Sequence, residues 1–493
     1  MSPNKALSNN TAALLIEALL SGVLSFVLYR FINHTLGVSY LGVWSVIFAT
    51  VSASRFADFG LSSSVTRFVA IYLARNAYKD VATLIETALL SLMLLLGILL
   101  PIFYLIAFQI VPHFFDTKYT EVAQMLLPYA FTSLGLNLTI SPILSALDGF
   151  QRMDLRASLN ITGQLLMVVI SIWLIPENGL IGLGIAQVIQ GMYLLISSWM
   201  MLRHQCIDLP KLPCHWSYPL FREMLAYGIN VQATGILRLV FDPITKVLMV
   251  RFGGVDAAGY FEMANQVVIK VRSLITGANS AIVPRVAQLL ETAPKDAHLL
   301  YRQNLRALIF ISLPFFTMLY SWSATISWLF MGQVNNELLF LLQLSCAAWS
   351  LSIVAVPAYF FNQGFGTVGL NTLTYAITGA TNIVFGVILG SLFGTNGVAW
   401  AYLVSLLLGH WFLITAFQRS KSIYWNILCL QEFKLLIIVC LLVIGGSHIV
   451  NQAISTVTLT FAATVVFTIV LAIASWMHPI RKEIMNRYLM GRR

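Results

Sequence analysis

The 493-residue chain is too apolar and too sparsely charged to be a soluble globular protein. Apolar residues make up 58% of it and charged residues 10%, whereas an average soluble domain is about 25% charged. The net charge of +10 would indicate a nucleic-acid partner only if basic residues clustered on a folded soluble face, and the sequence has no soluble domain to carry one. We therefore expect a multi-pass membrane protein.

Apolar stretches of about 20 residues, long enough to cross a hydrocarbon core roughly 30 Å thick, recur along the whole sequence. They are continuously apolar, which excludes a β-barrel, because barrel strands alternate with a period of two. The pattern predicts an all-α protein with fourteen transmembrane helices. In chain order, the expected spans are residues 11–32, 41–66, 82–108, 122–146, 157–175, 180–202, 225–250, 258–284, 303–329, 338–361, 371–392, 397–417, 434–452 and 455–477.

The second half of the sequence repeats the first at a distance of about 216 residues. Segment 40–44 (YLGVW) is echoed by segment 257–261 (AAGYF), and dipeptide 178–179 (NG) is matched to dipeptide 396–397 (NG). Each repeat holds six spans, an even number, so both halves enter the membrane in the same direction. A two-fold axis along the membrane normal should then relate two lobes, as in transporters that work by alternating access.

The repeat and the connecting segments divide the chain into four parts. The proline-rich, polar composition of the connector between the repeats indicates a linker rather than a span. The expected parts are an N-terminal lobe at 1–202, a cytoplasmic linker at 203–224, a C-terminal lobe at 225–417, and two extra spans with a basic tail at 418–493.

The distribution of basic residues predicts the orientation. With the N-terminus in the cytoplasm, nineteen Lys and Arg residues fall in inside segments and three in outside segments, a strong positive-inside bias. We expect both termini in the cytoplasm and the basic tail on anionic lipid headgroups. No cleavable signal peptide is visible. The sequence lacks a Walker A motif, so ATP use is not expected, and its five cysteines lack zinc-site spacing.

Ionisable side chains inside the spans indicate a transport path, because each costs at least ~2.5 kcal/mol near the bilayer centre unless it faces water or a partner. Five bases against four acids favour an anionic cargo, since arginine and lysine are the usual phosphate partners. The candidate headgroup-binding bases are Arg272, Arg238, Lys246, Arg55 and Lys270, and the candidate coupling or ion-pair acids are Asp242, Asp58, Glu262 and Glu17.

Arg272 differs from its repeat counterpart in its local sequence. Arg55 and Asp58 are three residues apart and share a helix face, which favours a structural ion pair. Arg272 has Ile275 in place of that acid, so it needs another counter-charge. A substrate phosphate and an acid from a neighbouring helix are equally compatible with the sequence.

The other bases are arranged differently along the second lobe. Arg238, Asp242 and Lys246 recur every four residues and should form one net positive stripe. Such a stripe would be costly against lipid, so it should line the interior. Lys270 and Arg272 are two residues apart, which places them about 160° apart on a helix, so they cannot both face one cavity.

Two segments resemble a known family. Segment 36–44 (LGVSYLGVW), followed by 57–61 (ADFGL), is similar to the opening of Wzx-type polysaccharide flippases, and segment 253–261 (GGVDAAGYF) is typical of their second lobe. The resemblance extends over the whole chain. It implies the two-lobed all-α fold of the multidrug/oligosaccharidyl-lipid/polysaccharide (MOP) superfamily, which includes MATE exporters and lipid II flippases.

The resemblance also implies a function. An undecaprenyl-diphosphate-linked oligosaccharide, such as an O-antigen, capsule or exopolysaccharide repeat unit, would move from the cytoplasmic to the periplasmic leaflet of the bacterial inner membrane. No cofactor is implied, and a glycan polymerase and a chain-length regulator are the implied protein partners. The alternatives are a lipid II flippase, a cation-coupled MATE-type exporter, which should prefer an acid-dominated pocket, and a membrane-embedded glycan polymerase or ligase. Against the last, the longest outer loop, residues 109–121, offers few catalytic candidates.

Overall fold

Long helices make up nearly all the secondary structure of the computed structural model, and no strand occurs in the part of the chain that it describes. Nine of the described helical segments are long and apolar enough to cross a membrane. The described residues are 3–53, 58–280, 282, 286, 294–365, 369–421, 432–453 and 457–481.

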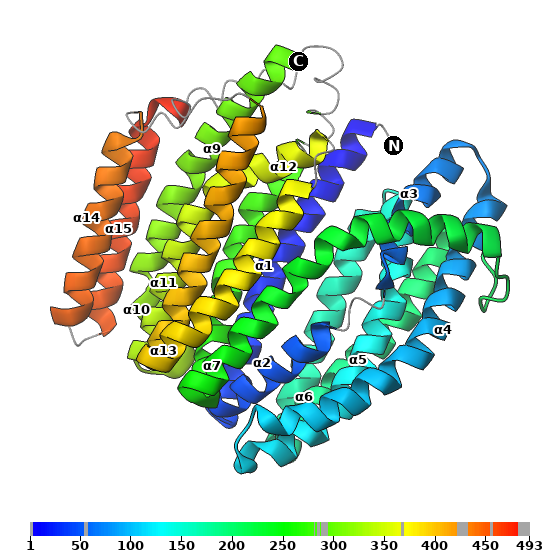
Figure 1. The fold of residues 1–493 in the computed structure, drawn as a ribbon, viewed down its shortest axis with the longest axis horizontal. Helices are drawn as coiled ribbons and strands as arrows, with labels where there is room; N and C mark the ends of the chain where they lie inside the picture. Colours follow the sequence, from blue (N-terminus) through cyan, green and yellow to red (C-terminus); the bar gives the residue numbers. More distant parts are fainter. Residues whose placement is uncertain are drawn as a thin grey trace. The chain divides into compact units, whose positions relative to one another are not determined.

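The first half of the chain consists of helices whose apolar faces pack on one another (Figure 1). The expected span at 41–66 is divided between two helices, α2 and α3, and the expected spans at 157–175 and 180–202 are the two arms of one helix, α6. The helices are α1 (Pro3–Thr35), α2 (Val38–Ala53), α3 (Leu61–Ala74), α4 (Tyr78–Ile110), the short 3₁₀ helix η2 (Val111–His113), α5 (Thr117–Gly149) and α6 (Met153–Gln205).

The second half repeats this architecture and adds two helices. The expected spans at 303–329 and 338–361 are each divided into shorter helices, and those at 371–392 and 397–417 are the arms of α13. The helices are α7 (Tyr218–Ser280), α9 (Pro294–Ser321), α10 (Ser323–Met331), α11 (Asn336–Ser352), the 3₁₀ helix η3 (Ile353–Ala355), α12 (Val356–Gly364), α13 (Gly369–Ser420), α14 (Lys434–Ala453) and α15 (Val457–Met477).

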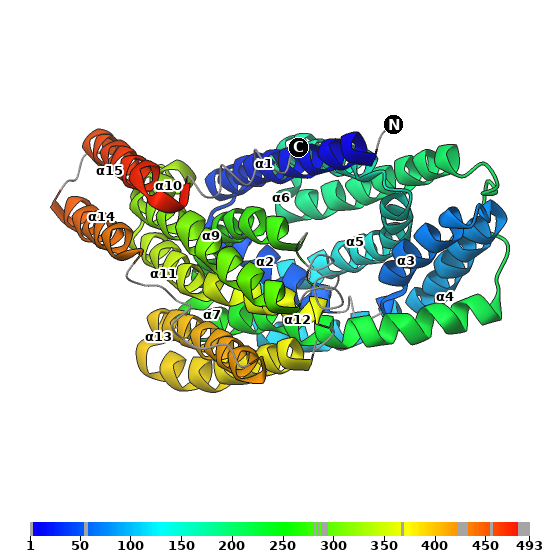
Figure 2. The ribbon, with the colours of Figure 1, turned by 90° about the horizontal axis from the view of Figure 1, so that it is seen from above.

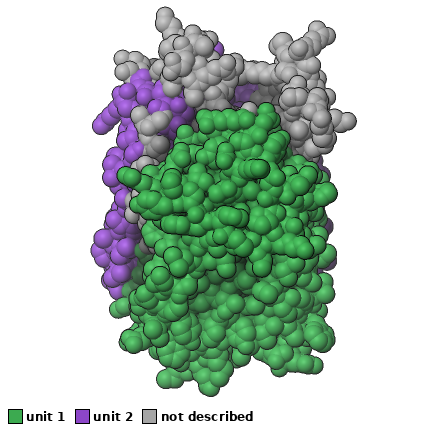
Figure 3. Space-filling view, turned by 90° about the vertical axis from the view of Figure 1, so that its right-hand side faces the viewer, with its two compact units in different colours: residues 1–259 green, residues 260–493 purple. Residues whose placement is uncertain are grey.

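The chain forms two compact units, Met1–Gly259 and Tyr260–Arg493 (Figure 3). In the first unit α5 packs against α2, α3, α4 and α6, and α1 lies along α6 (Figure 2). In the second, α9 contacts α11, α12, α14 and α15, around a buried aromatic cluster of Tyr301, Phe361 and Phe417. The units divide at residue 259, whereas the sequence repeat begins again near residue 225.

Glycines reverse the two long helical hairpins in the same way. Gly179 in α6 has φ 57° and ψ −140°, and Gly394 in α13 has φ 59° and ψ −139°. A left-handed φ is accessible to glycine at little cost. The equivalent turns are therefore 215 residues apart. The sequence match of dipeptide 178–179 to dipeptide 396–397 is wrong by three residues, because it follows the shared Asn-Gly letters rather than the turn.

One of the small residues through which the arms of each hairpin meet lies on opposite arms in the two halves. In α6, a Cβ added to Gly163 would lie 2.8 Å from Cδ2 of Leu194. In α13, 215 residues further on, a Cβ added to Gly409 would lie 3.2 Å from Cβ of Thr378. In both hairpins a glycine on one arm faces a larger residue on the other arm at the equivalent position. Small residues allow membrane helices to approach closely. The two lobes thus reach the same packing with exchanged partners.

Candidate functional site

Six of the nine predicted site residues lie on one helix, α7. Arg238, Asp242 and Lys246 precede its break at Gly254, and Glu262, Lys270 and Arg272 follow it. Helix α7 places Asp242 and Lys246 one turn apart. Arg55 lies outside the described residues, as does the side chain of Arg238.

Arg272 is positioned by an aromatic ring. Its guanidinium carbon lies 3.8 Å from the centroid of Trp349 on α11. Indole Nε1 of Trp349 donates a hydrogen bond of 2.9 Å to the hydroxyl of Tyr402 on α13, and the ring of His410 lies edge-on to Trp349 at 6.1 Å. Residues of α11 and α13 therefore position the ring that this guanidinium contacts. An aromatic face holds a cation by about 2 kcal/mol when both are desolvated, without supplying a negative charge.

Lys246 is buried, with 9% of its surface exposed. A buried lysine in a membrane helix faces protein or a cavity rather than lipid, because an ammonium in hydrocarbon is costly. Asp242 and Lys270 are half-buried. Lys246, Asp242, Lys270 and Arg272 all make polar interactions in the structure. Whether these residues also contact a substrate stays a prediction.

Three of the predicted acids, Glu262, Glu17 and Asp58, each accept a hydrogen bond from a neutral side chain. Glu262, which is buried, accepts from Nε2 of Gln266 at 2.8 Å. Glu17 on α1 accepts from Nδ2 of Asn160 on α6 at 2.7 Å. Asp58 accepts from the hydroxyl of Ser62 at 3.0 Å, at the start of α3. The Glu17 bond joins two helices, as expected for polar residues that hold membrane helices together.

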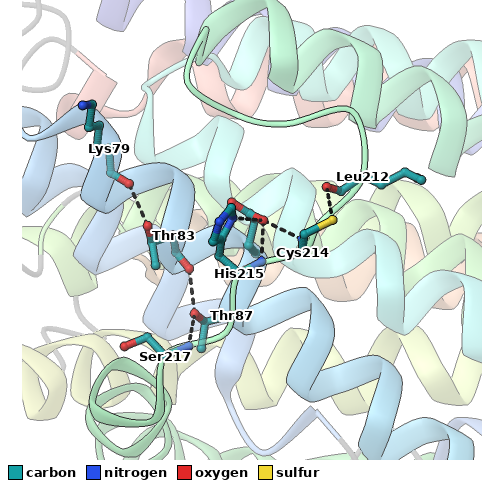
Figure 4. Close-up of polar contacts among 8 residues, drawn as sticks. Lys79, Thr83, Thr87, Leu212, Cys214, His215 and Ser217 are labelled. Atoms are coloured by element: carbon teal, nitrogen blue, oxygen red, sulfur yellow. Dashed lines mark hydrogen bonds and ion pairs between the residues drawn. The ribbon is translucent and has the colours of Figure 1, made fainter.

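A buried carboxylate outside the predicted set holds the linker. Glu86 on α4 is 2% exposed. Its Oε2 accepts hydrogen bonds from the backbone N–H of Cys214 at 2.6 Å and of His215 at 2.8 Å, and lies 3.3 Å from Nδ1 of His215. Figure 4 shows Cys214 and His215 turned toward α4. Three nitrogens gathered on one oxygen compensate for the desolvation of the charge.

Two further residues of α4 extend this contact. Thr87 Oγ1 accepts from the backbone N–H of Ser217 at 3.1 Å (Figure 4). Ser91 Oγ accepts from the indole Nε1 of Trp216 at 2.8 Å. Beyond the linker, the hydroxyl of Ser64 on α3 donates to the carbonyl of Met224 on α7 at 2.8 Å. The linker and the start of α7 are thus bonded to helices of the first repeat. This explains why the first compact unit extends beyond the end of the first repeat.

Removing Glu86 should release the linker. In Glu86→Ala, the N–H groups of Cys214 and His215 lose their acceptor. Because a hydrogen bond to a charged group contributes about 1.5–3 kcal/mol, trypsin cleavage at the exposed Lys211 in inside-out vesicles should accelerate roughly tenfold or more. Glu177→Ala, which removes an exposed acid from α6, is the matched control. Equal cleavage rates in the two variants would contradict the anchoring role.

The linker also provides a test of orientation. Cys214 is exposed, whereas Cys206, Cys346 and Cys440 are buried. Burial raises the pKa of the Cys206 thiol, which lowers its thiolate fraction and slows its reaction. With Cys429, which lies outside the described residues, replaced by serine, a membrane-impermeant maleimide should therefore label Cys214 in inside-out vesicles and leave intact cells unlabelled. Cys214→Ser should remove the signal. Labelling of intact cells that this variant abolishes would reverse the predicted topology.

Comparison with known proteins adds both a family and a fold. The family described as polysaccharide biosynthesis protein matches residues 7–290. A search of curated proteins finds no match to this sequence.

Several solved structures share the fold. The lipid II flippase MurJ in an inward closed conformation matches with a TM-score of 0.71 and 15% identity, over 98% of this chain and 99% of that one. An inward-facing multidrug resistance transporter of the MATE family matches with a TM-score of 0.60 and 13% identity, over 81% and 94%. A MOP superfamily transporter from Pyrococcus furiosus gives 0.60 and 12%, over 86% and 96%. These matches confirm the predicted two-lobed, all-α MOP fold.

Proposed function

We propose that this chain, which belongs to the polysaccharide biosynthesis protein family, is a flippase for undecaprenyl-diphosphate-linked oligosaccharide. The cargo would be an O-antigen, capsule or exopolysaccharide repeat unit, moved from the cytoplasmic to the periplasmic leaflet of the inner membrane. The family supports a role in glycan synthesis, and the transporter fold supports movement rather than chemical conversion. The observation that carries the choice of cargo is Arg272, whose guanidinium carbon lies 3.8 Å from the ring centroid of Trp349.

The proposed binding step follows from the chemistry of the bases. Arginine contacts phosphate oxygens through two parallel N–H groups, and lysine acts as a point charge. In this proposal Arg272 contacts the diphosphate with its plane already fixed by Trp349, so little side-chain entropy is lost on binding. Lys246 would contribute a second positive charge for the headgroup, at a different depth in the membrane. The lipid tail stays in the bilayer, and the lobes alternate around the headgroup.

Two transporter alternatives share this fold, and one assay separates them. A lipid II flippase would carry the same diphosphate lipid with a different glycan, and a MATE-type exporter would carry organic cations. The predicted site residues comprise five bases and four acids, which suits an anionic cargo better than an organic cation. A polymerase or ligase would instead lengthen or transfer the glycan.

Reconstitution tests the proposal directly. Purified protein in liposomes should move a fluorescent lipid-diphosphate-linked oligosaccharide between leaflets, measured by the fraction accessible to an external quencher. Protein-free liposomes and lipid II serve as the comparison. Faster movement of lipid II than of the oligosaccharide would favour the lipid II alternative. Uptake of a cationic dye driven by an ion gradient, without lipid movement, would favour the exporter.

A further inference from the structure

A short motif that the two lobes share has the same backbone geometry in each. The sequence Gly-Val-x-x-x-Gly occurs at residues 37–42 and 254–259, 217 residues apart. The first glycine of each copy has a positive φ, 93° at Gly37 and 81° at Gly254. A residue with a side chain would be strained there. In both copies, therefore, the chain turns at the first glycine, and the second glycine lies in the helix that follows.

The second glycine of each copy packs against the valine of the other. A Cβ added to Gly42 would lie 2.9 Å from Cγ1 of Val255 and closer still to its carbonyl oxygen. A Cβ added to Gly259 would lie 2.8 Å from Cγ2 of Val38 and closer still to its carbonyl oxygen. The same Cβ would be 3.2 Å from the backbone nitrogen of Gly42. Both contacts thus require glycine, and each is the repeat image of the other.

A third contact joins another pair of equivalent residues. The hydroxyl of Ser39 donates a hydrogen bond to Oδ1 of Asp256, and these positions are also 217 residues apart. We call this set of contacts the glycine clasp; it comprises Val38, Ser39 and Gly42 with Val255, Asp256 and Gly259. Each contact in the clasp therefore has a counterpart in which the two repeats exchange roles, as in an isologous dimer interface.

Contact between equivalent residues indicates where the clasp lies in the transport path. Equivalent residues can touch only where the axis that relates the two repeats passes between them. In transporters with parallel repeats this axis runs along the membrane normal, through the path between the lobes. A close-packed contact on the axis leaves no room for cargo at that depth.

We propose that the glycine clasp is the gate at one end of the path, and that it parts each time that end opens. The sequence-based topology places it at the periplasmic end. The inference rests on the proposed function only in assuming that the two repeats enclose a path. It assigns a role to the motif that carries the family resemblance: the first glycine makes the turn, and the second lets the two copies of the motif pack closely.

The first arm of α7, near its start, makes a contact of a different kind. A Cβ added to Gly228 would lie 2.5 Å from the carbonyl oxygen of Phe59 and 2.8 Å from the carbonyl carbon of Gly60. Gly60 and Gly228 are not repeat equivalents. This contact therefore need not lie on the axis. The reciprocal arrangement is specific to the clasp among the glycine contacts of the described residues.

A cross-link between Ser39→Cys and Asp256→Cys measures closure of the clasp. Both changes are made in the full-length protein, with a protease site inserted at Lys211 so that cross-linked halves stay together after cleavage. We expect rapid, reversible disulfide formation under mild oxidation. Adding Gly42→Ala or Gly259→Ala overpacks the closed contact and should slow cross-linking about fivefold or more. Gly97→Ala, on α4 with no atom within 4 Å of the added Cβ, is the control.

The outcomes separate a gate from fixed packing. Arrest of lipid movement by the disulfide, reversed by a reductant, supports a gate. Full activity of the cross-linked protein would show a static contact and overturn the proposal. Equal cross-linking rates with Gly42→Ala and Gly97→Ala would also overturn it. Cross-linking rates are measured without substrate and therefore test the clasp independently. A protein that moves no oligosaccharide in any state would refute the proposed function, but the cross-linking rates would still test the clasp.

Discussion

Arg272→Ala should lower the rate of oligosaccharide-lipid movement by roughly tenfold to a hundredfold, the loss expected when a charge-assisted contact to the cargo is removed. Arg55→Ala, at the repeat-equivalent position, should have the smaller effect. Asp58, three residues from Arg55, is the predicted counter-charge of that arginine, whereas Ile275 occupies the corresponding position in the second repeat. The measurement is surface glycan display in cells and quencher accessibility in liposomes, at matched protein levels.

Two substitutions separate the charge of Arg272 from its packing. Arg272→Lys keeps the charge but loses the planar group that stacks on Trp349, and should retain part of the activity. Trp349→Leu keeps the guanidinium but removes the surface that orients it, and should weaken substrate binding more than it lowers the maximal rate. Equal effects of Arg272→Ala and Arg55→Ala, or no effect of either, would remove the argument from the missing acid.

The sequence was sufficient to predict the membrane helices because continuous hydrophobicity is a local property of the chain. Twenty continuous apolar residues predict a span whatever surrounds them. The internal breaks were less visible. Expected span 338–361 contains the 3₁₀ segment Ile353–Ala355, just before Pro357. Expected span 41–66 is shared by α2 and α3. A run of apolar residues reports hydrophobicity but not where the backbone leaves the α conformation.

The repeat was found from the sequence, but its register was not uniform. The offset of 217 at Gly42 and Gly259 is confirmed by the reciprocal contacts of the clasp. At the second hairpin the turn geometry gives 215, between Gly179 and Gly394. Loop-length changes cause such drift. Only a backbone conformation, or a packing partner, can decide which of two nearby glycines is the equivalent one.

The sequence selected the charged residues of the candidate site, whose role stays a prediction, but it did not reveal the residues that contact them. A charged residue in a span is costly wherever it occurs, so Arg272 and Lys246 could be selected from the sequence alone. Trp349 is 77 residues from Arg272, and only the folded structure reveals their contact. Glu86 had a local signal, since it lies inside the expected span at 82–108, but its role depends on a linker more than 120 residues away.

Gly409→Leu should strongly destabilise the protein, and Thr378→Gly should restore it. In α13 the side chain of Thr378 fills the space that a side chain at Gly409 would need. Overpacking a close helix contact costs about 2–3 kcal/mol, so the single variant of this long chain should melt roughly 2–3 °C below the wild type. The double variant recreates the Gly163 and Leu194 pairing of α6, in which a glycine on the first arm accommodates a leucine on the second.

A matched substitution on the same helix controls for the added volume. Gly379 is in α13, and a Cβ added to it meets no atom within 4 Å. Gly379→Leu should therefore lower the melting temperature little, and Thr378→Gly should not rescue it. The double-mutant cycle measures the coupling between Thr378 and Gly409. A coupling near zero would mean that the two hairpins do not share one packing solution with exchanged partners, and the structural equivalence of the two lobes at this point would have to be abandoned.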